Sequence, residues 1–124
     1  MMSEIFARGP ISCSLFSDAP QFDNYKGGVI TCPDRKHPLC SVTYTDHVVV
    51  IAGWGVDKTS GLPFWIGRNS YGSHWGEGAG GGWFRVERGV DMLGLESNAC
   101  AWAVPAAGDV QRINDQYEAA TSVE

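Results

Sequence analysis

Long apolar runs and excess positive charge are both absent from this chain. No segment approaches the roughly 18–20 apolar residues that are needed to cross a bilayer. Residues 1–6 also lack a basic segment followed by a sustained apolar one, so we expect no secretory leader here. Nine Lys and Arg against 14 Asp and Glu give a net charge of −5, without long runs. This balance argues against nucleic acid or a membrane surface as a partner.

Paired C-x₂-C motifs are also absent, although the chain has four cysteines: Cys13, Cys32, Cys40 and Cys100. Four cysteines permit three pairings, and an even number fits an oxidising compartment, with free cytosolic thiols as the alternative. Cys32, His37 and Cys40 could supply three zinc ligands, but an obvious fourth ligand is missing. A local Cys32–Cys40 disulfide is the simpler interpretation. We therefore predict no metal site and no cofactor.

Glycine and tryptophan are abundant, with 16 and 5 residues respectively. Glycine permits positive φ and close backbone approach, and tryptophan supplies large apolar surfaces. The hydrophobic content of 44% is sufficient for the buried core of one ordinary domain. Together these features predict a loop-rich β structure with one crowded functional corner.

Four segments have the pattern of β-strands: 11–16, 47–55, 64–69 and 82–87. The second is continuously apolar and β-branched, which is typical of a central strand buried on both faces. A short helix is expected over residues 1–8, ended by Gly9 and Pro10, and mostly turns and loop over residues 17–43.

His47 and Asn69 occupy corresponding places on two of these strands. His47 opens the second strand and Asn69 ends the third. Alone, the first would be a buried structural histidine and the second a turn asparagine. If residues 60–63 form a turn that pairs the strands, the imidazole lies beside the amide oxygen. A histidine oriented in this way is the base-and-orienter pair of nucleophilic catalysis.

The same segments resemble a known family. Residues 46–55 and 64–77 are similar to the histidine and asparagine blocks of the papain-like cysteine peptidases. Residues 9–13 and 24–29 look most like the cathepsin X (cathepsin Z) branch of that family. The resemblance covers about residues 1–104, and residues 105–124 form a separate polar tail, expected to be a frayed helix or disordered.

The resemblance implies an α+β fold. Its C-terminal domain is β-barrel-like and antiparallel, here with a short N-terminal helix and loop-rich connections. In the family this domain supplies histidine and asparagine, and an N-terminal domain supplies the nucleophilic cysteine and an oxyanion glutamine. The nucleophile block Cys-Gly-Ser-Cys-Trp has no counterpart here. Cys13 lies in a strand predicted to be buried, so it is no substitute. The N-terminal half of the peptidase is therefore an expected partner, and the chain alone should be inactive.

The resemblance also implies roles for single residues. His47 would pair with the absent thiolate and protonate the leaving amine, while Asn69 orients its ring. Tyr71 stands where the family usually has tryptophan over the histidine–asparagine bond, and Trp75 would pack behind it, although a plain core aromatic fits equally well. Ser14 and Val48 would line the pocket for the substrate residue two before the scissile bond.

A Cys13–Cys100 disulfide matches the position of a pairing in the cathepsin X branch. The branch further implies a lysosomal or secreted peptidase that acts on peptides, in its type as a carboxypeptidase. Residues 76–81 satisfy the dinucleotide-binding pattern G-x-G-x-x-G, but a strand is expected after them, which favours a glycine-rich turn inserted relative to the family. A non-catalytic interaction module or a pseudoenzyme half is the alternative function.

Overall fold

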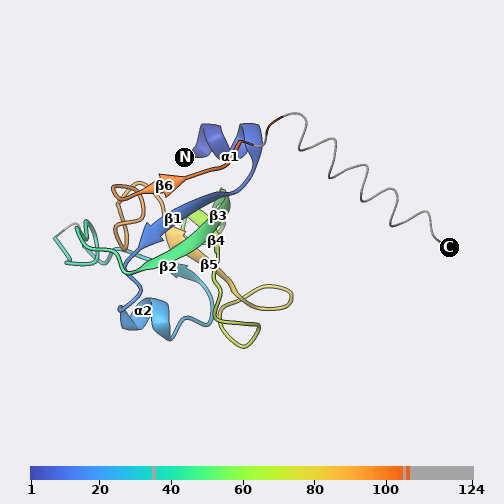
Figure 1. The fold of residues 1–124 in the computed structure, drawn as a ribbon. Coiled ribbons are helices and arrows are strands. Elements are labelled where there is room, and N and C mark those ends of the chain that lie inside the picture. The colour runs from blue at the N-terminus through green and yellow to red at the C-terminus, as the bar shows by residue number, and fades with distance from the viewer. Residues whose placement is uncertain (35, 105, 107–124) are drawn as a thin grey trace.

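The structure is a computed structural model that describes residues 1–34, 36–104 and 106 (Figure 1). Two short helices and six strands follow one another in the order α1 (Met2–Arg8), β1 (Ile11–Leu15), α2 (Pro20–Asp23), β2 (Val29–Ile30), β3 (His47–Val56), β4 (Pro63–Arg68), β5 (Trp83–Glu87) and β6 (Cys100–Ala101). None of the helices in these residues is long and apolar enough to cross a membrane. Nearly all of the polar tail predicted over residues 105–124 lies outside the described residues.

The strands form one six-stranded sheet in the order β2-β5-β4-β3-β1-β6. All neighbours are antiparallel except β2 and β5, which run parallel, so the sheet is mixed. Figure 1 shows α1 and α2 at opposite ends of this sheet. The predicted α+β class is confirmed, and the departure from a wholly antiparallel sheet is confined to one short edge strand.

The sequence patterns located the main strands to within one or two residues. Residues 17–43, however, are more ordered than expected, because they contain α2 and β2. Pro20 stands at the first helical position of α2, where its fixed φ and missing N–H cost nothing. The helix places Phe22 in the core with no exposed surface. A single turn with one apolar residue has too little periodicity to be predicted from sequence.

The core lies on one face of the sheet. Alternate residues of β1 are buried, and the adjoining strands and the loop after β5 complete the same layer. The largest fully buried side chains are Phe22, Phe84, Ile11, Leu15, Ile51, Met92, Leu93, Leu95, Val86 and Cys13. Gly67 on β4 is part of this packing, because a Cβ atom there would overlap the ring of Phe84.

The prediction that residues 47–55 are buried on both faces was wrong. Val49 and Ile51 are in the core, but Val48 and Val50 are 58% and 40% exposed. Side chains alternate between the faces of a strand, and no described residue covers Val48 and Val50 on the second face of β3. The apolar run therefore correctly predicts a central strand, but one face of that strand is exposed to solvent.

The β3–β4 hairpin brings the ends of two strands together. Val56 pairs with Pro63 at its closed end, and residues 57–62 form the connecting loop, which is longer than the turn expected at 60–63. The pairing register shifts between Ile51 and Gly53, a β-bulge that bends the strand. At the open end of the hairpin the start of β3 therefore lies beside the end of β4.

Both predicted disulfides, Cys13–Cys100 and Cys32–Cys40, are present. The first joins directly opposed residues of β1 and β6 across a sequence separation of 87. In the chain-entropy model a loop of this length is worth about 4.5 kcal/mol, as an upper value. The bond therefore ties the short edge strand β6, which has few other contacts, to the sheet.

Candidate active site

His47 and Asn69 meet as the hairpin predicts. Nε2 of His47 lies 2.8 Å from Oδ1 of Asn69. His47 is the first residue of β3 and is half-buried, and Asn69 follows the last residue of β4 and is only 6% exposed. The amide N–H of Asn69 donates to the carbonyl of Gly82 at 2.8 Å, which fixes the backbone at this point. The predicted proximity of the two side chains is confirmed.

The orientation of the Asn69 amide determines the tautomer of His47. The backbone N–H of Ser70 donates to Oδ1 of Asn69 at 2.8 Å, which identifies that atom as an oxygen. An amide oxygen can only accept, so Nε2 of a neutral His47 must carry the proton. Among the described residues nothing hydrogen-bonds to Nδ1 of His47. That nitrogen is therefore free to take up a proton.

Aromatic rings cover one side of this pair. The ring of Tyr71 lies 5.1 Å from that of His47 and is tilted by 34°. Trp75, which is 5% exposed, contacts Tyr71 edge-on at 5.6 Å. Its indole N–H donates to the carbonyl of Asp23 in α2 at 2.9 Å. Tyr71 and Trp75 are thus in the predicted arrangement, one over the histidine and the other behind it.

Phe22 lies at the centre of this aromatic cluster, and sequence reasoning missed it. Its ring is within 6.2 Å of the rings of both His47 and Tyr71, 5.0 Å from Trp75 and 5.2 Å from Phe84. The one available signal was an aromatic residue two positions after a proline in a polar stretch. Such a residue can indicate a short helix with a buried anchor.

Ser14 and Val48, the predicted substrate-pocket residues, are directly opposite each other on β1 and β3. They share the uncovered face of the sheet with Ser12 and Val50. Cys13, by contrast, is 1% exposed and disulfide-bonded, so it carries no free thiol. The uncovered face is therefore a small surface of two serines and two valines on β1 and β3, close to His47 at the start of β3.

Asp46, the residue before His47, is anchored to the loop after β1. Its Oδ1 accepts from the amide of Ser17 at 2.7 Å and from the hydroxyl of Ser17 at 3.0 Å. Burial works to raise the pKa of Asp46, but these hydrogen bonds outweigh it, so the pKa lies below its usual value. The anchored carboxylate fixes where β3 begins, and hence where His47 stands.

Residues 76–81 form a turn, as predicted, and β5 follows them. Glu77 and Trp83 exchange backbone hydrogen bonds of 2.8 and 3.2 Å across it. Gly81 has φ +64°, and any side chain there would overlap the carbonyl of Ser73. A dinucleotide site needs a helix after the glycines, and a strand is there instead.

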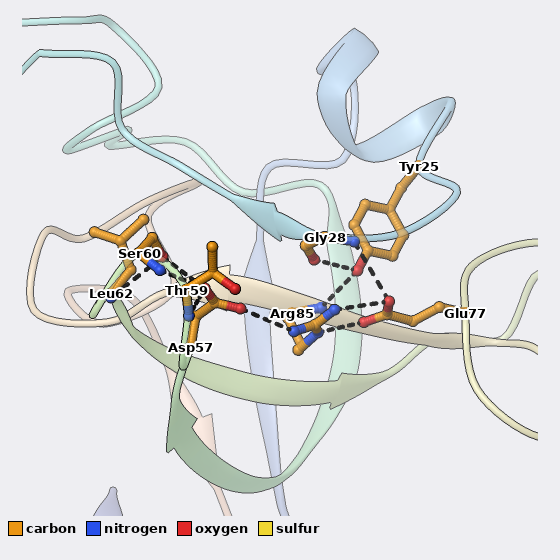
Figure 2. A network of polar contacts seen from close by, with 8 residues as sticks. All are labelled: Tyr25, Gly28, Asp57, Thr59, Ser60, Leu62, Glu77 and Arg85. Carbon is orange, nitrogen blue, oxygen red and sulfur yellow. Dashed lines mark hydrogen bonds and ion pairs between the residues drawn. The ribbon is translucent and has the colours of Figure 1, made fainter.

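A charged network joins this turn to the sheet, as Figure 2 shows. The guanidinium of Arg85 on β5 binds both carboxylate oxygens of Glu77, at 2.6 and 3.1 Å. It also lies 3.7 Å from Asp57 in the β3–β4 loop. The hydroxyl of Tyr25 donates to the carbonyl of Gly28 at 2.5 Å and accepts from the amide of Arg85 at 3.2 Å.

The network shifts the pKa values of its members. The hydrogen bonds from Arg85 lower the pKa of Glu77, with burial acting in the opposite direction. Burial raises the pKa of Tyr25, and the neighbouring Glu77 adds to this effect. At neutral pH the network therefore contains two ionised carboxylates, those of Glu77 and Asp57, a guanidinium and a neutral phenol.

Among the described residues, no hydrogen bond or ring contact joins the other two histidines, His37 and His74, to His47 or Asn69. Cys32 and Cys40 are bonded to each other, which excludes the zinc interpretation while the disulfide is intact. Among the described residues no group of three or more His, Cys, Asp or Glu is placed to hold a metal ion. A cavity of about 370 Å³ is lined by α2, β2, the loop between them and the residues just after β2. Tyr25 of the charged network is among its lining residues, whereas His47, Asn69 and Tyr71 are not.

Comparison with family models shows that residues 1–114 match the papain family of cysteine proteases. Cathepsin Z of Onchocerca volvulus is 37% identical over 114 residues, which cover 86% of this chain and 33% of that protein. Dipeptidyl aminopeptidase 1 of Plasmodium falciparum is 35% identical over 115 residues, which cover 80% of this chain and 16% of that protein.

A solved structure from work on antibody cross reactivity between the mite allergens Blo t 1 and Der p 1 has the same fold. It aligns with a TM-score of 0.71 and 34% identity over 84% of this chain and 30% of its own. The chain thus spans about a third or less of the length of these relatives.

Proposed function

The chain belongs to the papain family of cysteine proteases, and from that premise we propose that it is the C-terminal half of a peptidase of the cathepsin Z type. In this proposal His47 and Asn69 are catalytic, and the nucleophilic cysteine belongs to an N-terminal half. The observation that carries the proposal is the 2.8 Å contact between Nε2 of His47 and Oδ1 of Asn69. It holds the ring in one tautomer and leaves Nδ1 available for a proton.

The mechanism follows from this tautomer. In the assembled enzyme Nδ1 of His47 takes the thiol proton, and the resulting imidazolium stabilises the thiolate. The thiolate attacks the scissile carbonyl, and the proton on Nδ1 passes to the leaving amine. Asn69 stays hydrogen-bonded to Nε2 throughout. Tyr71 covers the pair and keeps water from competing for that bond.

The uncovered face of β1 and β3 supports the proposal that a second half of the peptidase packs against this chain. Val48 and Val50 are exposed on a central strand, where an apolar surface of this kind is typical of an interface. We assign the N-terminal, cysteine-bearing half as the partner that covers Val50 and its surroundings, and Ser14 and Val48, at the edge of this face near His47, line the substrate pocket. The two disulfides fit a secreted or lysosomal setting. Carboxypeptidase action is the mode we propose, by analogy with the cathepsin Z type.

Complementation tests this function. The N-terminal half of a close relative, supplied in trans or as a fusion, should restore peptidase activity, and a thiol-alkylating epoxide should abolish it. His47→Ala should reduce kcat by about 10²–10⁴-fold, because proton transfer and thiolate stabilisation are lost together. His74→Ala is the matched control, because His74 lies exposed in the loop that carries Tyr71 and should be silent. Activity that survives His47→Ala but not His74→Ala would refute the assignment.

A pseudoenzyme half or non-catalytic interaction module is the second candidate. Tyr71 in place of the family's usual tryptophan and the glycine-rich turn at 76–81 favour it. It predicts that the complemented protein assembles as a compact, folded complex but cleaves no peptide. Assembly without cleavage, in a complex whose cysteine still reacts with the epoxide, would select this candidate.

A further inference from the structure

The loop of residues 69–82 carries Tyr71, but among the described residues no hydrogen bond reaches the hydroxyl of Tyr71. Its ring is located by contacts with other rings, at 5.1 Å from His47 and 5.6 Å from Trp75. Contacts of this kind are weakly directional compared with a hydrogen bond. The position of the ring over His47 therefore depends on where the backbone of the loop lies.

The base of the loop is closed by its own backbone. Asn69 N–H donates to the carbonyl of Gly82 at 2.8 Å, and Gly82 N–H donates to the carbonyl of Trp75 at 2.6 Å. These bonds give the loop its internal shape. The loop is also held to the sheet by the backbone hydrogen bonds between Glu77 and Trp83 of β5, and by the guanidinium of Arg68 on β4, which donates to the carbonyl of Gly81 at 2.6 Å.

Glu77 adds an ion pair between the loop and the sheet. It is the one acidic residue in the loop, and it binds the guanidinium of Arg85 with both oxygens. It also accepts from the amide of Gly28 at 3.4 Å. Arg85 pairs with Ile66 of β4 inside the sheet, so its backbone is fixed. Two parallel N–H···O bonds define an orientation as well as a distance.

Tyr25 links the same ion pair to the aromatic cluster. Its hydroxyl accepts from the amide of Arg85, and its ring lies 5.6 Å from that of Trp75. Gly76, next to Glu77, donates its N–H to the carbonyl of Tyr25 at 3.3 Å. Displacement of Glu77 would therefore move Trp75, and with it Tyr71.

We infer that Glu77 and Arg85 are positioning residues that hold Tyr71 over the His47–Asn69 hydrogen bond. Part-exposed ion pairs add little to the free energy of folding. We therefore expect the main effect of this pair to be on the position of the loop that carries Tyr71. The catalytic part of the inference rests on the proposed function. The geometric part does not, since it concerns only the shielding of a hydrogen bond within this chain.

The experiment uses Glu77→Gln and Arg85→Lys. Glu77→Gln keeps the shape of the side chain but removes its negative charge. Arg85→Lys keeps the positive charge but loses the planar guanidinium that binds both carboxylate oxygens. Asp57→Asn is the matched control, because Asp57 faces the same guanidinium at 3.7 Å from a loop outside residues 69–82. In the complemented enzyme we expect kcat to fall by about tenfold with KM within about twofold for the first two variants, and no change for the control.

A second readout needs no activity. In the ¹⁵N-histidine-labelled chain, the Nε2–H of His47 should exchange with water several-fold faster in Glu77→Gln and Arg85→Lys than in wild type or Asp57→Asn. A lower melting temperature with unchanged exchange and unchanged kcat would overturn the inference and leave the pair merely structural. If Glu77→Gln does not fold, Arg85→Lys decides the question by the same criteria. Should the complemented enzyme prove inactive, the proposed function fails, but the exchange rates still decide the positioning role.

Discussion

Two polar pairs bracket the loop of residues 69–82, and they are built in opposite ways. His47 and Asn69, at its start, join neutral groups beneath aromatic rings. Glu77 and Arg85, near its end, join opposite charges at a part-exposed surface. The first pair leaves one ring nitrogen without a partner among the described residues, whereas the second uses both carboxylate oxygens and the guanidinium fork. A free, oriented nitrogen is suited to proton transfer, and a saturated ion pair is suited to holding a backbone in place.

Breaking the neutral pair should have the larger effect on activity. Asn69→Ala removes the acceptor for Nε2, so His47 can rotate and change tautomer while the acid–base group remains. We expect kcat of the complemented enzyme to fall by about tenfold to a hundredfold, less than for His47→Ala. Steady-state kinetics of the two variants measured side by side check this order. A loss from Asn69→Ala equal to that from His47→Ala would mean that Asn69 does more than orient the ring.

Breaking the charged pair should, besides its effect on kcat, give a pH-dependent effect on stability. The folded-state pKa of Glu77 lies below its usual value of 4.5, mainly because of the hydrogen bonds from Arg85. Its stabilising contribution is therefore fully present above the unfolded pKa and is lost as the pH falls through the lower folded value. Glu77→Gln has no such titration. The difference in free energy of unfolding between wild type and this variant should shrink below about pH 4.5.

Urea denaturation at several pH values measures that difference. The carboxylates of Asp46 and Asp57, whose pKa values are also lowered, are present in both proteins. Their contributions therefore largely cancel in the comparison. A wild type–variant difference that stays constant from pH 7 to pH 3 would show that the Glu77–Arg85 pair has no charge-dependent role.

A smaller effect should come from the ring between the two pairs. Tyr71→Trp offers a larger apolar face to the His47–Asn69 bond, and we expect kcat to rise on the order of twofold, equivalent to about 0.4 kcal/mol. The pH range of activity should widen in the same variant, because the imidazolium is held more firmly. No gain in a properly folded protein would mean that Phe22 and Trp75 already exclude water from the bond.

The neutral pair could be predicted from sequence because its geometry is local. A continuous β-branched run, a turn and a second apolar run imply a hairpin, and a hairpin brings the first residue of one strand to the end of the next. His47 and Asn69 follow from that alone. The family resemblance added roles and the Cys13–Cys100 pairing, which no periodicity contains.

The charged network could not be predicted in this way. Tyr25, Asp57, Glu77 and Arg85 come from four separate segments, and each alone is an ordinary loop or strand residue. Tyr25 reaches Arg85 beside the parallel pairing of β2 with β5, a two-residue contact without a sequence signature. Asp57 and Glu77 reach it from two separate loops. The exposure of one face of β3 was also not predicted. An apolar run indicates that a strand is buried, but not whether the residues that bury it belong to the same chain.

The protonation of His47 tests the central claim most directly. ¹⁵N NMR of the histidine-labelled chain, at a pH where the ring is neutral, reports which ring nitrogen carries the proton. The 2.8 Å contact with Oδ1 of Asn69 predicts a proton on Nε2 and a bare Nδ1, and Asn69→Ala should abolish this preference. A proton on Nδ1 in the wild-type chain, or an even mixture of tautomers, would contradict the account.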